Sequence, residues 1–411
     1  MEEILNKIKQ KEKIEYNLLE KTFNDYLTDK LEEEKMTEIL KYICTYGLCE
    51  ENILDLTDIF VKSGTTLGEN YNYLDKHSTG GVGDKTSLIV LPILASLGIK
   101  ISKMSGKALG YTGGTIDKLN SIGVKTDLTN EEIKKSLENC NMVISSQTKD
   151  LCPMDKKVYA LRDKTNTTNS IELIAISIMS KKIASGAGKI LIDIKVGKGS
   201  LVGNIENARR LAKLMIKIGK KYDRKVVCML TRMDEPLGNN IGNKIEILEV
   251  IKVLKNEEKG PLRELVLKMA AIMYQMETNA NKKKSYHEVL SALNTQKAYE
   301  TFKKYVTYQG GNLNINLVSP KYLVSKKSGY IKEIDAKKVG LICNELKENN
   351  NQYDAGIILK IKKGDYIQKE KLLGEFYGNK ETDINKFYDC LKYSHFKRKN
   401  KDIIIDIIYW K

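Results

Sequence analysis

The chain has 411 residues and carries 69 Lys plus Arg against 53 Asp plus Glu, a formal net charge of +16. Its 41% hydrophobic and 30% charged content is typical of globular proteins, which excludes intrinsic disorder, and its length predicts two or three domains. No apolar run approaches the ~18 residues of a membrane helix, so we expect no membrane partner. The charged, amphipathic opening MEEILNKIKQKEKIE lacks the apolar core of a secretory signal, which predicts a cytoplasmic protein.

Residues 1–62 have apolar side chains that return every three or four positions, which predicts helices. A short strand at 71–75 then leads through the glycine-rich segment HSTGGVGDKTS into an apolar helix at 86–97. A second strand, GIKISKMSG, leads through LGYTGGT into a helix that opens at Thr115 or Ile116. Each strand thus feeds a helix through a turn rich in glycine.

Two further strands follow, KILIDIKVG at 189–197 and VVCML at 226–230, the second of the buried parallel kind. Strands that alternate with helices predict an α/β sheet. From about residue 325 the pattern changes to short strands and turns, which predicts a separate C-terminal α+β subdomain; its strands are expected in GYIKEID, GIILKIKKGDYI and DIIIDIIYW.

The distribution of the positive charge is typical of a solvated protein surface. The basic residues are mostly Lys and are scattered along the chain beside Glu, Asp or Asn. Nucleic-acid-binding proteins instead gather Lys and Arg in a stripe or interleave them with aromatic platforms, so we expect no nucleic-acid partner. The seven Cys are far apart and form no CxxC pair, which favours buried thiols in a reducing compartment over a thiolate metal site.

The two glycine-rich turns, at 76–87 and 105–115, predict an anion site. Glycines let backbone N–H groups converge, and a helix N-terminus adds a partial positive charge. Neither turn has the spacing of a nucleotide P-loop or of GxGxxG. A single such turn can be a plain tight connection, but two turns with matching hydroxyls favour phosphate binding. The side chains that would add an ammonium or a hydroxyl are Lys76, Ser78, Ser87, Ser105 and Thr115.

His77 lies inside the first turn, where a near-neutral imidazole can move a proton; a structural His is the alternative. The apolar helix at 170–184 carries Ser177 and Lys181 at a spacing that places them on one face. That face is either the solvent side of the helix or a narrow polar groove. Arg162 precedes this helix, and its planar guanidinium suits a carbonyl or imide edge.

Taken together, these motifs resemble those of the thymidine phosphorylase / pyrimidine-nucleoside phosphorylase family in order and spacing. The resemblance covers nearly the whole chain, because GYIKEIDAKKVG and DAGIILKIKKGDYI are similar to the family's terminal domain. The other matching motifs are DKHSTGGVGDKTS, SGKALGYTGGTIDKL, YALRDKTNT, SIMSKKIASG, DIKVGKGS and MDEPLGNNIGN.

The resemblance implies a homodimer whose subunit has a small helical lobe, a large mixed α/β lobe with phosphate-binding Gly-rich loops, and a C-terminal α+β subdomain. Residues 1–66 and 154–187 would form the helical lobe, which carries dimerisation and base binding. Residues 67–153 and 188–324 would form the α/β lobe, and 325–411 the C-terminal subdomain. The lobes would close to assemble the site and exclude water.

The implied reaction is reversible phosphorolysis of pyrimidine nucleosides (thymidine, deoxyuridine and uridine) to free base and α-D-(deoxy)ribose 1-phosphate, in nucleoside salvage and catabolism. Inorganic phosphate would be a co-substrate, with no cofactor. On matching positions, phosphate would be held by Lys76, Ser78, Ser87, Lys103, Ser105 and Thr115. The base would be held by His77, Arg162, Ser177 and Lys181. Of these, a protonated His77, Arg162 and Lys181 would be catalytic, because they stabilise the negative charge on the leaving base.

Some bacterial relatives bind potassium through positions that match Gly83, Lys85, Leu237, Asn240 and Glu249. In this chain Lys85 would place its ammonium against Glu249 and replace the ion, because a second cation there is repelled. We therefore expect no metal and no need for potassium. The alternative is that Lys85 points to solvent.

The chain departs from the family pattern at Lys107, Tyr111 and Asn120, where SGR, HTGGT and DKLE become SGK, YTGGT and DKLN. Three alternative functions stay open: a strictly thymidine-specific phosphorylase, an anthranilate-type phosphoribosyltransferase, and a non-catalytic nucleoside-binding relative. The second needs an acidic magnesium site that the sequence does not offer convincingly. The third conflicts with the intact base-binding positions, and the SIMSKK stretch favours broad specificity.

Overall fold

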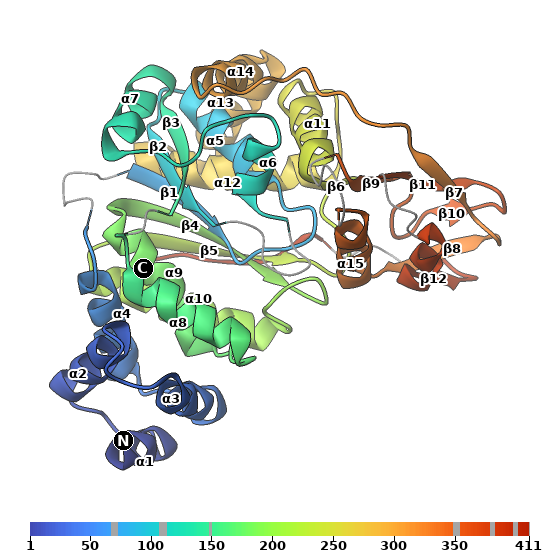
Figure 1. Cartoon of the computed structure of the whole chain (residues 1–411). Coiled ribbons are helices and arrows are strands. Elements are labelled where there is room, and N and C mark those ends of the chain that lie inside the picture. The colour runs from blue at the N-terminus through green and yellow to red at the C-terminus, as the bar shows by residue number, and fades with distance from the viewer. Residues whose placement is uncertain are drawn as a thin grey trace.

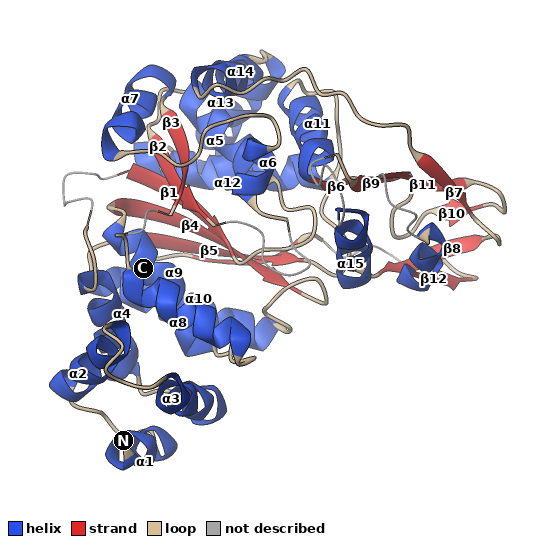
Figure 2. Cartoon of the chain, in the orientation of Figure 1, coloured by secondary structure: helices blue, strands red, loops and turns tan. Residues whose placement is uncertain are grey.

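The computed structural model describes residues 1–66, 73–106, 113–147, 150–347, 354–378, 383–397 and 402–410. Figure 1 and Figure 2 show a central sheet with helices on both faces. The N-terminal helices lie beyond one face of the sheet, and a mostly β C-terminal part lies at one end. Within the described residues, no helix is both long and apolar enough to cross a membrane.

The central sheet has the strand order β13-β5-β4-β1-β2-β3. The pairs β5–β4, β4–β1, β1–β2 and β2–β3 are parallel, and β13 is antiparallel to β5. The bounds of the strands are β1 Tyr73–Ser78, β2 Ile101–Ser105, β3 Met142–Ser146, β4 Ala187–Val196, β5 Lys225–Arg232 and β13 Ile404–Ile408.

The residue pattern of β4 explains why it occupies the middle of this sheet. Its side chains alternate between two hydrophobic cores: Ile190 and Ile192 pack in the core on the N-terminal helices' side, and Leu191 packs in the opposite core. All three side chains are fully buried. A strand that is apolar on both faces needs helices over both, which is the arrangement of parallel α/β sheets.

One face of the sheet is covered by helices that follow the glycine-rich turns and by a later helical group. Most of them share one core with the sheet, built around α5, α12, α13 and α14, while α7 packs on β3 at the sheet's edge. The bounds are α5 Thr86–Ser96, α6 Thr115–Asn120, α7 Asn130–Cys140, α11 Asn243–Leu254, α12 Pro261–Thr278, α13 Lys282–Asn294 and α14 Lys297–Tyr308.

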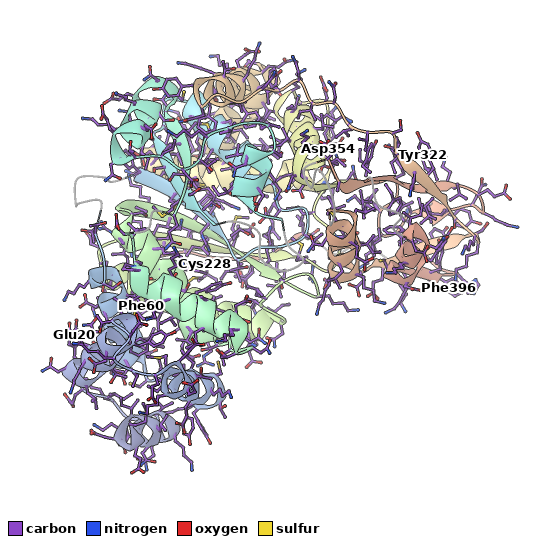
Figure 3. All side chains as sticks on the ribbon, viewed as in Figure 1. Glu20, Phe60, Cys228, Tyr322, Asp354 and Phe396 are labelled. Carbon is purple, nitrogen blue, oxygen red and sulfur yellow. The ribbon has the colours of Figure 1, made fainter. Side chains whose placement is uncertain are left out.

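The other face is covered by α9 and α10, against which the N-terminal helices and α8 pack. Figure 3 shows Phe60 among these helices and Cys228 in the sheet behind them. The bounds are α1 Glu2–Gln10, α2 Tyr16–Leu27, α3 Glu33–Tyr46, α4 Glu50–Lys62, α8 Pro153–Lys164, α9 Ile171–Ala184 and α10 Ile205–Lys221.

The C-terminal part contains two small sheets, ordered β10-β8-β12 and β6-β9-β11-β7, around a core of its own. Tyr322 and Phe396 lie exposed at its outer end (Figure 3). The bounds are β6 Asn240–Gly242, β7 Lys321–Val324, β8 Gly329–Ile334, α15 Ala336–Lys347, β9 Gly356–Leu359, β10 Tyr366–Ile367, β11 Leu372–Tyr377, the 3₁₀ helix η1 Ile384–Cys390 and β12 Leu391–Ser394.

One expectation about this part is wrong. The segment DIIIDIIYW was assigned to the subdomain at 325–411, but its strand β13 pairs with β5 in the central sheet. The physical reason is its apolar alternation, because Ile407 packs into one core of the central sheet and Ile408 into the other. A strand with both faces apolar is stabilised more by the two-sided sheet than by a small antiparallel sheet.

The cysteines are free thiols. Five of them are buried, as expected, whereas Cys44 is exposed and Cys49 half-buried. Among the described residues, no group of three or more His, Cys, Asp or Glu side chains is placed to hold a metal ion.

Candidate active site

A cavity of about 690 Å³ lies between the carboxyl ends of β1 and β2 and the helices α8 and α9. In open parallel sheets the carboxyl ends of the strands are the usual place for a ligand. Nine of the ten side chains predicted for phosphate and base line this cavity together: His77, Ser78, Ser87, Lys103, Ser105, Thr115, Arg162, Ser177 and Lys181.

Lys76 is the predicted ligand that does not line the cavity. Its ammonium donates to Thr86 Oγ1 at 2.6 Å, lies 3.8 Å from Asp193 and is fully buried, and this burial lowers its pKa. Alternate residues of a strand face opposite sides, so Lys76 shares the face of Leu74 toward α5. The ammonium therefore lies beneath the first turn.

The first turn is organised around a carboxylate. Asp84 accepts hydrogen bonds from Ser78 Oγ, Thr86 Oγ1 and the Thr86 backbone N–H. Burial raises the pKa of this carboxyl, but the ammonium groups of Lys76 and Lys195 and the two hydroxyls outweigh it and hold the pKa well below its usual range. Asp84 is therefore ionised and fixes the hydroxyls that end β1 and begin α5.

Lys103 reaches the same turn from β2. Its ammonium donates to the backbone carbonyl of Lys76 at 2.8 Å. Burial, followed by repulsion from the neighbouring Lys182, lowers the pKa of Lys103 to about 7. An anion bound in the cavity would offset this repulsion, so the charge of Lys103 is coupled to anion binding.

The surroundings of His77 favour the neutral imidazole in the free site, whereas the protonated form is expected with phosphate and the leaving base bound. Desolvation lowers the pKa of His77 well below 6.5, and the ammonium groups of Lys182 and Lys103 lower it further. A neutral imidazole still offers one N–H donor and one acceptor nitrogen. Its expected role as a cation stays a prediction for the site with an anion bound.

Arg162, on α8, is anchored by the backbone that connects α8 to α9. Its Nε, Nη1 and Nη2 donate to the carbonyls of Thr167, Leu173 and Thr168 at 3.3, 3.2 and 3.0 Å. A guanidinium has five N–H groups, so these three bonds leave two for a ligand. Such anchoring fixes the orientation of the fork before a ligand arrives.

Lys181 and Ser177 form the pair on α9 that the spacing predicts. The Lys181 ammonium donates to Ser177 Oγ at 2.9 Å and to the carboxylate of Asp155 on α8. Since Ser177 Oγ accepts from Lys181, its own O–H is free to donate. The third N–H of Lys181 is also unused by these two bonds, so this side of the cavity presents mainly hydrogen-bond donors.

The cavity residues that the sequence reasoning did not name include four with polar side chains near the predicted ligands: Asp84, Asp155, Tyr159 and Lys182. Lys182 forms a buried ion pair with Asp75 at 2.7 Å, beside the strand end that carries His77. A signal existed for α8, because residues 155, 159 and 162 lie four and three apart and so share one helix face. The Asp84 carboxylate stands inside the first turn, but nothing in its spacing reveals its three hydrogen bonds.

The positions matched to potassium lie together at the start of α5, outside the cavity. Lys85 is 1% exposed, so the alternative that it points to solvent is wrong. Of the family departures, Asn120 ends α6 and its Oδ1 accepts from Thr126 Oγ1 at 2.9 Å. Lys107 and Tyr111 lie outside the described residues.

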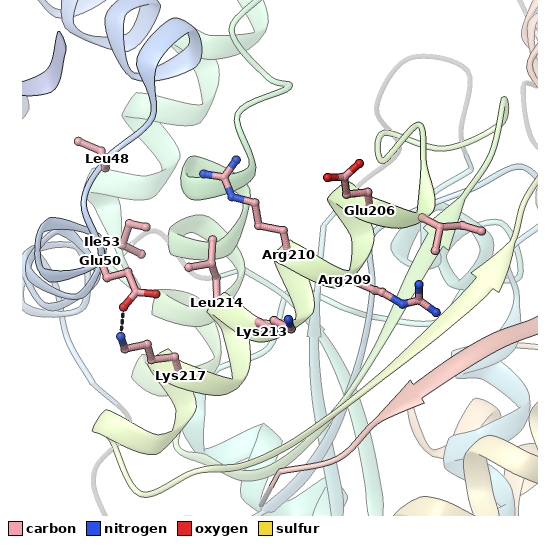
Figure 4. Close-up of a pocket in the computed structure, with 10 residues that line it drawn as sticks. Leu48, Glu50, Ile53, Glu206, Arg209, Arg210, Lys213, Leu214 and Lys217 are labelled. Carbon is pink, nitrogen blue, oxygen red and sulfur yellow. Dashed lines mark hydrogen bonds and ion pairs between the residues drawn. The ribbon is translucent and has the colours of Figure 1, made fainter. Parts of the chain in front are cut away.

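A second hollow, of about 810 Å³, lies between α4 and α10 (Figure 4). It is lined by Arg209, Arg210, Lys213 and Lys217 together with apolar side chains such as Leu214. Three of these four cations already pair with carboxylates, namely Asp406, Glu172 and Glu50. This hollow contains none of the predicted site residues.

Residues 70–299 match the family model described as "Glycosyl transferase family, a/b domain". The pyrimidine-nucleoside phosphorylase of Geobacillus stearothermophilus is 37% identical over 93% of this chain and 94% of its own length. The chain belongs to the pyrimidine-nucleoside phosphorylase family. The Bacillus subtilis (strain 168) family member of the same name is 38% identical over 90% of both chains.

This family shares its fold with a phosphoribosyltransferase. The crystal structure of anthranilate phosphoribosyltransferase from Thermus thermophilus covers 75% of this chain and 99% of its own, with a TM-score of 0.59. At 15% identity this likeness concerns the fold alone. The pyrimidine-nucleoside phosphorylase family is therefore favoured over the anthranilate-type alternative.

Proposed function

We propose that this protein catalyses the reversible phosphorolysis of pyrimidine nucleosides to free base and α-D-(deoxy)ribose 1-phosphate. The observation that carries the proposal is the single cavity lined by nine residues at family phosphate and base positions. Membership of the pyrimidine-nucleoside phosphorylase family supports the same reaction. The proposal includes thymidine, deoxyuridine and uridine as substrates, with inorganic phosphate as co-substrate.

The strand ends and helix starts would hold the phosphate. Ser87 lies in the first turn of α5 and Thr115 begins α6, so both hydroxyls sit where backbone N–H groups and the helix dipole favour an anion. Lys103 adds an ammonium whose proton the anion stabilises. Lys76 would act from below, because its carbonyl fixes Lys103 and its ammonium fixes Thr86.

The α8–α9 side would hold the base. When the bond between C1′ and N1 breaks, the electron pair leaves with the base and its carbonyl oxygens gain negative charge. The donors left on Arg162, Ser177 and Lys181 suit those oxygens, and donors held in place before the reaction lower such barriers most. A bound phosphate would raise the pKa of His77, so that its imidazole can donate to the base as well.

Phosphate-dependent release of thymine from thymidine, and of uracil from uridine, tests the proposal. We expect both in the unmodified protein and a fall of about 100-fold or more in kcat/KM in Lys181→Met, which removes a charged donor to the leaving base. Lys189→Met is the matched control. Its ammonium pairs with Glu277 away from the cavity, and the variant should keep its rate.

The outcomes separate the alternatives. Release from thymidine but not from uridine would replace broad specificity with strict thymidine specificity. No phosphate-dependent release from thymidine, uridine or deoxyuridine would reject the reaction and favour a non-catalytic nucleoside-binding relative. An equal rate in Lys181→Met and the unmodified protein would reject the assigned site.

We further propose a homodimer, supported by the family resemblance, in the cytoplasm, a reducing compartment that suits the free cysteines. Light scattering coupled to size exclusion should give twice the 46.6 kDa of the chain. A monomeric mass at micromolar concentration would reject the dimer.

A further inference from the structure

A buried lysine ammonium sits in a cage of oxygens beside the first glycine-rich turn. Lys85 Nζ donates to the backbone carbonyls of Leu237 and Asn240 at 3.0 and 2.7 Å, and to Glu249 Oε2 at 2.5 Å. An ammonium has three N–H donors, so the three acceptors satisfy it completely. Both side chains of the ion pair are nearly inaccessible to solvent, at 0% and 3% exposed.

The carboxylate of the cage is equally well satisfied. Glu249 Oε1 accepts from the backbone N–H of Asn239 at 2.6 Å, and Oε2 accepts from that of Asn240 at 3.1 Å. A Cβ on Gly238 would stand 2.5 Å from Glu249 Oε2, and Gly238 has a φ of +74°. The loop before β6 is therefore shaped to fold around this carboxylate.

The first turn meets the cage closely. Gly83 has a φ of +75°, and a Cβ there would stand 2.5 Å from the carbonyl oxygen of Leu237, one of the cage acceptors. The backbone N–H of Leu237 donates in turn to the carbonyl oxygen of Val82 at 3.0 Å. Lys85 is also the N-cap residue of α5, two residues before Ser87. The ammonium thus ties the turn that would hold phosphate to the loop before β6.

We infer that the Lys85 ammonium is a built-in replacement for a monovalent metal ion, and that it holds the first turn in its anion-binding shape. The family positions for potassium are Gly83, Lys85, Leu237, Asn240 and Glu249, and three of them accept hydrogen bonds from this ammonium. The residues present therefore do not fit a bound potassium ion, since the ammonium occupies the site. No step of the reaction runs through a metal.

A second cation close by strengthens the case. Lys362, from the C-terminal part, donates to the carbonyl of Gly238 at 2.5 Å, and its charge interacts with Glu249 and with Lys85. A metal ion added to this cage would meet two ammonium groups and one carboxylate. At separations of a few ångströms in a buried site, that repulsion is strong.

The test compares two substitutions of the same residue. Lys85→Ser removes the ammonium and leaves room and oxygens for an ion, whereas Lys85→Met removes the charge and fills the space. Each protein is measured in potassium, sodium and tetramethylammonium chloride at equal ionic strength. The readouts are Tm and the KM for phosphate, of which only the second rests on the proposed function.

In the unmodified protein the Tm should differ by no more than about 1 °C among the three salts. Its KM for phosphate should differ by no more than about twofold. In tetramethylammonium both variants should lose about 5 °C or more in Tm, since each leaves a buried carboxylate without its partner. Their KM for phosphate should rise about tenfold or more. In Lys85→Ser, potassium should restore most of the lost Tm and most of the affinity for phosphate. In Lys85→Met it should restore neither.

Three results would overturn the inference. The first is stimulation of the unmodified protein by potassium by more than about threefold over tetramethylammonium, a measurement that requires no variant to fold. The second is a Lys85→Ser protein equal to the unmodified one in all salts. The third is a damaged Lys85→Ser protein that potassium restores no better than it restores Lys85→Met. An inactive unmodified protein would reject the proposed reaction, while the Tm comparison would still decide the role of Lys85.

Discussion

Burial and neighbouring charges set the protonation of single side chains in this cavity. Burial, and after it repulsion from Lys182, lowers the pKa of Lys103 to about 7, and the same two causes lower the pKa of His77. Asp75 and Asp84 supply the opposite charge from β1 and the first turn. An anion bound beside Lys103 and His77 would offset these effects and favour their protonated forms.

The lowered pKa of Lys103 predicts how phosphate binding depends on pH. Above pH 7 the free site loses the Lys103 proton, and a bound anion restores it, so binding takes up a proton. We expect the KM for phosphate to rise with pH above 7, by about tenfold per unit at most. Lys103→Met should have a higher KM with a flatter slope, measured from pH 6 to 9. An equal slope in both proteins would contradict this assignment.

The same depressed pKa has a consequence for folding. Between pH 7 and the usual Lys pKa of 10.5, the unfolded chain binds a proton that folded Lys103 does not. The contribution of this residue to the free energy of unfolding therefore increases with pH across that window.

Asp155 is a positioning residue for the base side. Asp155→Asn keeps the shape but removes the charge that orients the Lys181 ammonium. Hydrogen bonds to charged groups contribute about 1.5–3 kcal/mol, so we expect kcat/KM for the nucleoside to fall about 10- to 100-fold. The KM for phosphate should stay within about twofold, because Asp155 lies on α8. A rise in both KM values together would indicate general disruption of the fold instead.

At the scale of the elements, β4 is the strand on which both hydrophobic cores depend. Ile190 is fully buried in one core, so Ile190→Ala should lower the free energy of unfolding by about 2–5 kcal/mol, and Ile190→Val by about 0.5–1.5 kcal/mol. Chemical denaturation followed by circular dichroism measures both. Tyr322→Ala is the control, because that side chain is 62% exposed and should change stability by less than about 0.5 kcal/mol. A smaller effect of Ile190→Ala than of Tyr322→Ala would contradict the packing described.

The elements also show how far sequence reasoning reaches. The alternation of 189–197 predicted β4, and the glycine-rich turns predicted that helices begin near residues 86 and 115, where α5 and α6 start. Local periodicity carries this information because side chains on one face recur about every 3.6 residues in a helix and every two residues in a strand. The partner of β13 could not be read this way, since its pairing with β5 is a long-range choice.

For the candidate site, too, local sequence predicted the residue types, whereas long-range packing decided how they are oriented and protonated. Eight of the cavity's predicted ligands could be read from residue type and spacing, whereas Lys103 was implied only by the family resemblance. The direction of the Lys76 ammonium was not visible, because it depends on which face of β1 packs on α5. The proton lost from His77 was also hidden, since it results from burial and from lysines on other elements.

For the whole molecule, β13 covers β5, which would otherwise be an edge strand of the central sheet. Ending the chain after residue 401 would leave β5 with unpaired backbone groups and apolar side chains, which is a template for association with other chains. We expect such a protein to form large aggregates in size exclusion. Trp410→Ala, which leaves β13 intact, should elute as the unmodified protein does. An unchanged elution of the shortened chain would contradict this role of β13.

The distance along the chain between β5 and β13 also determines how long β5 waits for its partner strand during synthesis. The bond from Arg232 Nε to the carbonyl of Asp402 joins residues 170 positions apart. At about 5–20 residues per second, the ribosome needs roughly 10–30 s to deliver the second after the first. During that interval β5 lacks its partner strand, so a delay in translation between these positions would lengthen the period in which its edge is exposed to other chains.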